Sequence, residues 1–102
     1  MVFDNKLYVS DDLKSKRTRI KWELKFGLHK LDFYVVTLAS GDDMLEIFKA
    51  SMFKQKFFRK MPYHIVGFAS SYDKAVDLIQ TMLKDSFQAS SNYNIKEYFL
   101  NK

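Results

Sequence analysis

The stretch LDFYVVTLASGDDMLEIF, residues 31–48, decides the fold of this chain. Apolar residues occupy odd and even positions alike over its first half, which predicts a strand that is covered on both faces. Ser40 and Asp43 follow at the spacing of a capping box, and this spacing predicts a helix that continues to Met52. The stretch is therefore typical of a buried strand followed by a helix.

A second unit of the same kind follows later in the chain. The sequence YHIVGFA, residues 63–69, predicts another buried strand, which Pro62 separates from the residues before it. Ser70 and Asp73 repeat the capping-box spacing and predict a helix to about Ser86. We expect its apolar side chains to point inward. They are Ala75, Val76, Ile79, Met82, Leu83 and Phe87.

The residues before residue 31 predict a further strand and helix. The strand covers residues 6–9, and Ser10 or Asp11 can cap a helix that ends at Gly27. On a helical wheel one apolar stripe contains Arg17. The apolar members of this stripe are Leu13, Ile20, Leu24 and Leu28. Trp22 and Phe26 lie on a different side, so this helix has a second apolar surface.

The connection between the strands at 31–39 and 63–69 indicates their direction. A hairpin uses about two to five residues, whereas a parallel pair needs a crossover of a dozen or more. The connection here is longer than twenty residues. We therefore expect an α/β fold in the order β-α-β-α-β-α, with a small, mostly parallel sheet of three or four strands and three main helices. Residues 94–99 form either a helical turn or a last strand, and we favour the turn.

Length and composition predict one globular domain over residues 1–102. Hydrophobic residues make up 47% of the chain and charged residues 28%, and no cysteine is present. Disulfide and thiolate chemistry are therefore excluded. The first ten residues lack the features of a signal peptide, and no apolar stretch approaches the ~20 residues of a membrane span. We expect a cytoplasmic protein that does not enter the membrane.

Two resemblances accompany these patterns. The pairing of LDFYVVTLASGDDMLEIF with YHIVGFASSYDKAVDLIQTM, preceded by KLYVSDDLKSK, resembles a group of small uncharacterised bacterial α/β proteins, which implies the fold and no activity. Residues 7–13 and 67–69 also resemble strand motifs of RNA-recognition-motif domains, whose aromatics stack bases. Val66 stands where that motif has a cation, and Ser70 and Ser71 replace the residues that follow. The second stacking position is therefore missing.

The net charge of +5 is concentrated in two segments. Residues 14–30 sum to +6 and residues 49–60 to +5, while the other segments are neutral or acidic. Such clustering attracts polyanions, but it is also typical of an ordinary solvated face. Fourteen of the seventeen cations are lysine, which lacks the fork geometry of arginine. The candidate polyanion-binding residues are Lys14, Lys21, Lys25, Lys54, Lys56, Arg59 and Lys60.

The segment MFKQKFFRKMPYH, residues 52–64, alternates cations with aromatic rings. Exposed rings beside cations are typical of proteins that bind single-stranded nucleic acid. In the alternative, which we favour, Phe53, Phe57 and Phe58 point inward and the lysines face water. A protein interface is a third interpretation. The candidate interface residues are Arg17, Trp22, Phe26 and Phe58.

Catalytic and metal chemistry find little support. His29 and His64 have no carboxylate at ligand spacing, and the acidic pairs at 11–12 and 42–43 are explained as helix starts. The three glycines form no phosphate loop. We therefore expect no catalytic residue, no metal and no cofactor, and the pattern disfavours an enzyme.

Three functional hypotheses follow from these residues. The first is a binding or assembly module without enzymatic activity that forms a homo-oligomer and contacts a protein partner. The second is a binder of nucleic acid or another polyanion through residues 14–25 and 54–60. The third is a small-molecule or anion site where strands end, near Ser40, Gly41, Ser70 and Ser71.

Overall fold

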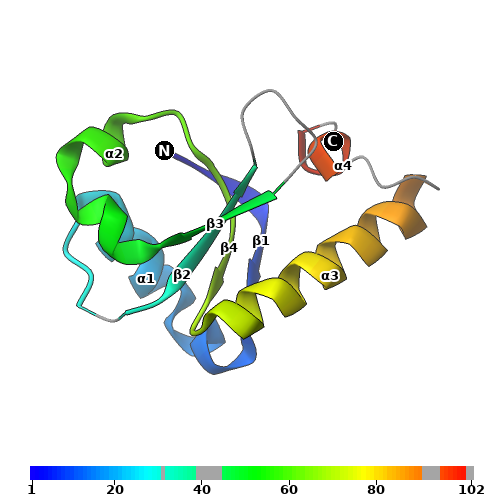
Figure 1. Cartoon of the computed structure of the whole chain (residues 1–102), viewed down its shortest axis with the longest axis horizontal. Coiled ribbons are helices and arrows are strands. Elements are labelled where there is room, and N and C mark those ends of the chain that lie inside the picture. Colours follow the sequence, from blue (N-terminus) through cyan, green and yellow to red (C-terminus); the bar gives the residue numbers. More distant parts are fainter. Residues whose placement is uncertain (31, 39–44, 91–94, 101–102) are drawn as a thin grey trace.

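A four-stranded sheet organises the part of the chain that the structure describes (Figure 1). The structure is a computed structural model, and it describes residues 1–30, 32–38, 45–90 and 95–100. The strands are β1 (Val2–Val9), β2 (Tyr34–Leu38), β3 (Leu45–Lys49) and β4 (His64–Ala69), and their order in the sheet is β1-β4-β2-β3. The helices are η1 (Asp11–Lys16), α1 (Arg17–Phe26), η2 (Ala50–Lys54), α2 (Lys56–Lys60), α3 (Tyr72–Ser90) and α4 (Ile95–Leu100), of which η1 and η2 are 3-10 helices.

The sheet is mixed, so the expected α/β class is confirmed and the expected mostly parallel sheet is wrong. β1 runs parallel to β4, while β2 is antiparallel to both β4 and β3. The long connection between β2 and β4 contains a strand, β3, that reverses the chain before η2 and α2. The length of this connection did not predict the direction of β4, because the connection contains a strand of the same sheet, β3, in place of a helical crossover.

The helix expected to run from Asp43 to Met52 is a second correction. Residues 45–49 form β3, in which Leu45 pairs with Leu38 and Ile47 pairs with Val36. Pairing with β2 supplies hydrogen-bond partners to the backbone of residues 45–49 and covers their apolar side chains. This pairing outweighs the local preference for a helix that the capping-box spacing indicated. The predicted cap residues Ser40 and Asp43 lie outside the described residues, as does Gly41.

Helices cover both faces of the sheet and create two apolar cores (Figure 1). The core beneath η1, α1 and η2 includes Leu13, Ile20, Leu24, Val35, Phe53, Ile65 and Phe68. The core beneath α3 and α4 includes Val36, Leu38, Val66, Ala75, Met82, Ile95 and Phe99. Because both faces are covered, β2 and β4 are apolar at consecutive positions, as the sequence predicted.

The predicted first helix is confirmed, although its beginning differs from the expectation. It starts as η1 at Asp11 and continues as α1, and Gly27 ends it in the left-handed conformation with φ of 69°. Ser10 stands at the N-cap position, but its hydroxyl donates to the Asp12 carboxylate rather than capping the backbone. The strand before this helix is longer than the predicted residues 6–9.

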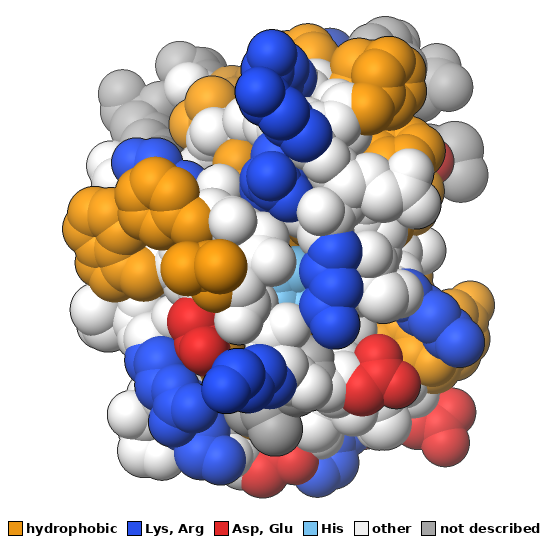
Figure 2. All heavy atoms as spheres, turned by 90° about the vertical axis from the view of Figure 1, so that its left-hand side faces the viewer, with side chains coloured by type: hydrophobic (Ala, Val, Ile, Leu, Met, Phe, Trp, Pro, Cys, Tyr) orange, Lys and Arg blue, Asp and Glu red, His pale blue; other side chains and the backbone are white. Residues whose placement is uncertain are grey.

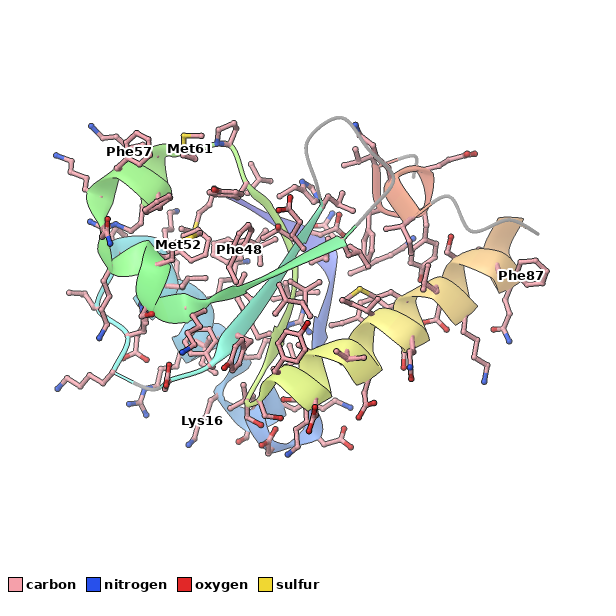
Figure 3. The ribbon with its side chains drawn as sticks, viewed as in Figure 1. Lys16, Phe48, Met52, Phe57, Met61 and Phe87 are labelled. Carbon is pink, nitrogen blue, oxygen red and sulfur yellow. The ribbon has the colours of Figure 1, made fainter. Side chains whose placement is uncertain are left out.

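The last two helices follow the sequence closely. α3 extends four residues past the predicted Ser86, and Ser71 rather than Ser70 accepts a hydrogen bond from the backbone N–H of Lys74. Of its predicted inward residues, Ala75 and Met82 are buried, whereas Phe87 is exposed (Figure 3). The favoured helical turn near the C-terminus is confirmed as α4. Within the described residues no helix is long and apolar enough to cross a membrane.

Candidate functional site

The two basic segments meet where α2 packs against the end of α1. On the face of the molecule shown in Figure 2, Lys and Arg side chains lie among apolar ones, with a few carboxylates between them. Arg59 of α2 lies against Gly27, at the end of α1, where a side chain would collide with the guanidinium group. Its Nη1 donates to the carbonyl oxygens of Phe53 at 2.9 Å and Lys54 at 2.7 Å. Arg59 therefore holds α2 against η2 and the end of α1, and part of its donor capacity is used within the fold.

Two exposed rings on α1 lie parallel to each other. Trp22 and Phe26 are 53% and 54% exposed, their centroids are 5.8 Å apart, and the planes differ by 9°. They are one helical turn apart, which brings them onto the same side of α1. The Nζ of Lys25 lies 5.1 Å from the Trp22 centroid and 5.9 Å from the Phe26 centroid. The pair is thus a solvent-facing aromatic surface with a cation against it.

A second exposed ring lies on α2. Phe57 is 67% exposed and makes an edge contact with Phe58, with centroids 5.2 Å apart. Met61 lies beside it, near the end of the same helix (Figure 3). Phe53 is fully buried and Phe58 is half-buried, so only part of the predicted inward set points inward. The expectation that Phe57 belongs to the core is wrong, because α2 is a short helix whose outer side faces solvent.

Charge on these segments is almost entirely positive. Residues 14–30 and 49–60 contain twelve Lys and Arg side chains and a single carboxylate, Glu23. Glu23 is half-buried and forms an ion pair with Arg19 at 3.3 Å. The lysines at 21, 25, 54, 56 and 60 are all exposed. We call this surface, made of Trp22, Phe26, Phe57 and these five lysines, the basic aromatic face.

The other predicted site residues lie elsewhere. Lys14 forms an ion pair with Asp11 at 2.8 Å, and both belong to η1. Arg17 is exposed at the start of α1 and has no ion pair within the described residues. Of the four candidate interface residues, only Trp22 and Phe26 therefore form one surface.

The parallel strands β1 and β4 end beside a hydrogen-bonded cluster centred on Asp12. Its carboxylate accepts from the Ser70 hydroxyl at 2.5 Å, the Lys74 Nζ at 2.9 Å and the Ser10 hydroxyl at 2.7 Å. These donors, led by Ser70, hold the pKa of the Asp12 carboxyl well below its usual range. The cluster joins η1 to the start of α3. Sequence reasoning missed it because Ser70 and Lys74 are about 60 residues from Ser10 and Asp12, and the serines and the aspartate are each ordinary residues for a helix start.

The predicted small-molecule or anion site at the strand ends includes Ser40 and Gly41, which lie outside the described residues. Leu38 pairs with His64 and Tyr34 pairs with Ala69, so β2 ends at the edge of the sheet where β4 begins. The last residue of β2 therefore lies beside the first residue of β4. The expected site near Ser40, Gly41, Ser70 and Ser71 stays a prediction.

Both histidines have structural partners. The Nε2 of His29 lies 2.7 Å from the Ala50 carbonyl oxygen in a buried position, and the Nε2 of His64 lies 2.8 Å from the buried Asp4 carboxylate. Asp4 also accepts from the Lys6 backbone N–H at 2.8 Å, where the register of β1 is irregular. Within the described ranges no three potential metal ligands come together.

Phe68 is fully buried, so its ring is not available to stack on a base as the resemblance to RNA-recognition-motif domains required.

A groove of about 860 Å³ lies beside β1. It is bordered by residues of β1, by η1 and the start of α1, and by one side of α3, and Tyr98 of α4 also lines it.

Comparison with protein families, with curated proteins and with solved structures finds no match to this chain. The resemblance to small bacterial α/β proteins therefore stays a prediction.

Proposed function

We propose that the protein binds single-stranded nucleic acid through the basic aromatic face. The observation that carries this proposal is the exposed, parallel pair Trp22 and Phe26 with Lys25 against both rings. Apolar rings of this size are normally buried, and two of them side by side in water indicate a surface that is covered when a partner binds. Nucleobases stack on such rings, each stack being worth about 1–3 kcal/mol.

The cations around the rings supply the second requirement. Five exposed lysines lie on the same elements as the aromatic residues: Lys21 and Lys25 on α1, Lys54 on η2, and Lys56 and Lys60 on α2. The one carboxylate of these segments, Glu23, forms an ion pair with Arg19. Lysine contacts phosphate as a point charge and does not read base edges in a fixed geometry. We therefore expect binding with little sequence preference, a preference for single strands over duplex, and a strong dependence on salt.

The same charges argue against self-association through this face. Two copies that met at Trp22 and Phe26 would bring two strongly positive surfaces together, and like charges across an interface are unfavourable. A polyanion neutralises these charges and covers the rings at the same time. The homo-oligomer that the sequence led us to expect stays a prediction. It would have to form through a different surface, or at a salt concentration that screens the positive charges of this face.

The chain contains one tryptophan, so binding can be followed without a label. Oligothymidylate or oligouridylate of about twenty nucleotides should quench Trp22 fluorescence. Fluorescence anisotropy of labelled oligonucleotides should give a dissociation constant that rises steeply between about 50 mM and 200 mM salt, with a logarithmic slope of ~0.7 for each phosphate neutralised. Phe26→Ala should weaken binding about 5- to 150-fold, the cost of one lost stack.

Matched controls are available on the opposite side of the sheet. Phe87 is an exposed ring on α3, far from α1 and α2 in the view of Figure 3, and Lys84 is an exposed lysine on the same helix. Phe87→Ala and Lys84→Gln should leave binding unchanged, whereas Phe57→Ala and Lys25→Gln should weaken it. Equal effects of both sets, or binding independent of salt, would contradict the proposal.

A further inference from the structure

The groove beside β1 is separate from the basic aromatic face, and its wall includes an edge of β1 that no described strand covers. In the sheet order β1-β4-β2-β3, β1 has a neighbour on one side only among the described strands. The groove is lined by residues 5–11 of this strand and its continuation, and by Lys74, Asp77, Leu78 and Thr81 of α3. An edge strand with a groove along it is the arrangement to which extended peptides add as a further strand.

The register of β1 shows which backbone groups face the groove. The Ser10 N–H donates to the Phe68 carbonyl oxygen of β4, and Tyr8 pairs with Gly67 of β4. In a parallel pair the backbone groups of successive residues point to opposite sides of the strand. The N–H and C=O of Val9 therefore point away from β4, toward the groove. The side chains of Leu7 and Val9 lie in the same core, so the alternation continues to Leu7 and gives its backbone groups the same direction.

The side chains of Leu7 and Val9 confirm that the groove exposes main chain at these positions. Both side chains are buried in the core beneath α1, yet both residues line the groove. A bound segment thus meets backbone donors and acceptors at Val9 and Leu7, with the aliphatic side chain of Leu78 and the ring of Tyr98 beside them. These are the elements of a site where main-chain hydrogen bonds supply affinity.

The charges of the lining specify the partner. Four cations line the groove, namely Lys6, Lys14, Arg17 and Lys74, against two carboxylates, Asp11 and Asp77. Asp11 is neutralised by Lys14 at 2.8 Å, and Lys74 is held by Asp12. Arg17 is exposed and without an ion pair in the described part of the chain, and the Lys6 Nζ is held by the Tyr98 carbonyl oxygen at 3.2 Å. The excess charge is positive, and it complements carboxylates.

We propose that this groove binds an extended acidic peptide segment, which pairs with the edge of β1 as a fifth strand. Arg17 and Lys6 contact acidic side chains of the peptide, and the backbone of Val9 and Leu7 contacts its main chain. The irregular register between Phe3 and Tyr8 limits pairing to the second half of β1, so the paired stretch is a few residues long.

The test uses the full chain and the acetylated, amidated peptide ETVEVTVET as the probe. Titration followed by amide NMR should show shifts at Leu7 and Val9 and slower hydrogen exchange of their N–H groups. The charge-reversed peptide KTVKVTVKT should bind at least about tenfold more weakly, since it brings cations against Arg17 and Lys6. Two further acidic peptides carry N-methyl groups, one on the odd-numbered residues and the other on the even-numbered residues. Only one of these two sets of N–H groups faces β1, so only one of the two peptides should lose binding.

Protein variants separate the groove from the rest of the surface. Thr81 is an exposed residue of α3 that lines the groove, so Thr81→Trp should fill the groove and reduce peptide affinity at least about tenfold. Gln80 is the neighbouring residue and does not line the groove, so Gln80→Trp should leave the affinity unchanged. Arg17→Glu should weaken the acidic peptide and strengthen the charge-reversed one. Absence of binding by the acidic peptide at millimolar concentration, or equal binding of the two charge forms, would overturn the proposal. Loss of oligothymidylate binding in Thr81→Trp, with no effect on the peptide, would assign the groove to nucleic acid instead and would also overturn it.

Discussion

At the scale of single residues, burial and specific neighbours set the state of the ionisable side chains. His29 is buried at the edge of the core, where its Nε2–H donates to the Ala50 carbonyl oxygen and its ring contacts Phe33 edge-on. Burial lowers the pKa of His29 and outweighs the carbonyl oxygens of Ala50 and Glu23, which favour the protonated ring. The nearby positive charge of Lys54 acts in the same direction as burial. The neutral ring is therefore the form that the fold prefers.

This preference predicts a loss of stability in mild acid. An unfolded histidine titrates near pH 6.5, and His29 titrates below that value in the folded state, so the unfolded state takes up the proton first. The contribution of His29 is fully present above about pH 6.5 and is lost as the pH falls from there toward the folded pKa. We expect the urea midpoint to decrease between about pH 7.5 and pH 5, a range in which unpaired carboxylates stay ionised.

The variant His29→Gln keeps a donor for Ala50 and cannot take up a proton in this range. Its absolute stability should be lower, and its urea midpoint should change less with pH than that of the natural chain. His64→Gln serves as the comparison, because His64 is more exposed and bound to Asp4. A pH dependence that is unchanged in His29→Gln would show that other groups cause it.

At the scale of elements, the segment from η2 to α2 illustrates how neighbouring rings take opposite roles. Phe53 of η2 is fully buried and contacts Tyr63 edge-on, with centroids 5.6 Å apart. Phe57, four residues later, is 67% exposed on α2. Gln55 separates the two helices in an extended conformation, so the helical spacing that would align the two rings is interrupted. Phe53 therefore belongs to the core and Phe57 to the surface.

Paired substitutions should separate these roles. Phe53→Ala removes a core ring and should cost about 3–5 kcal/mol of unfolding free energy. Phe57→Ala should change the unfolding free energy by less than about 0.5 kcal/mol, because the ring is mostly in contact with water. Chemical denaturation of both variants measures the difference. A large loss in Phe57→Ala would show that this ring packs against the protein, and would remove it from the basic aromatic face.

At the scale of the whole molecule, the sheet separates two surfaces of different character. The layer with η1, α1, η2 and α2 carries most of the positive charge, while the layer with α3 and α4 is mixed in sign. The edge of β1 lies between the two layers and forms the groove with α3. Net positive charge and the exposed pair Trp22 and Phe26 thus coincide on the layer that contains α1 and α2, and we expect this asymmetry to influence self-association.

Salt should therefore control self-association through the basic aromatic face. The screening length is about 10 Å at 0.1 M salt and about 3 Å at 1 M, so repulsion between two positive faces weakens greatly over this range. Without nucleic acid, we expect the 12.1 kDa chain to be monomeric at low salt and to associate through Trp22 and Phe26 at high salt. Light scattering after size exclusion measures the mass. Association at low salt that persists in Trp22→Ala would indicate a different contact between copies.

The sequence by itself determined the features that depend on neighbouring residues. Gly27 ends the first helix, because glycine adopts the left-handed conformation without cost. The continuous apolar run of residues 65–69 forms a strand that is buried on both faces. The apolar periodicity of α3 and the turn that became α4 were also predictable. The exposed Trp22 and Phe26 were visible too, as a second apolar side of one helix.

Only the tertiary structure decided the features that depend on residues far apart in the chain. β3 is a strand because β2 lies beside it, and that pairing reverses the chain and makes the sheet mixed. The Asp12 cluster, the contact of Arg59 with Gly27 and the groove along β1 each join segments that local propensity treats separately. The physical reason is that backbone pairing and burial are shared between distant segments. A short stretch of sequence shows its own preference for helix or strand. The segment that pairs with it or covers it depends on the whole chain, and so do the sites that form between the two segments.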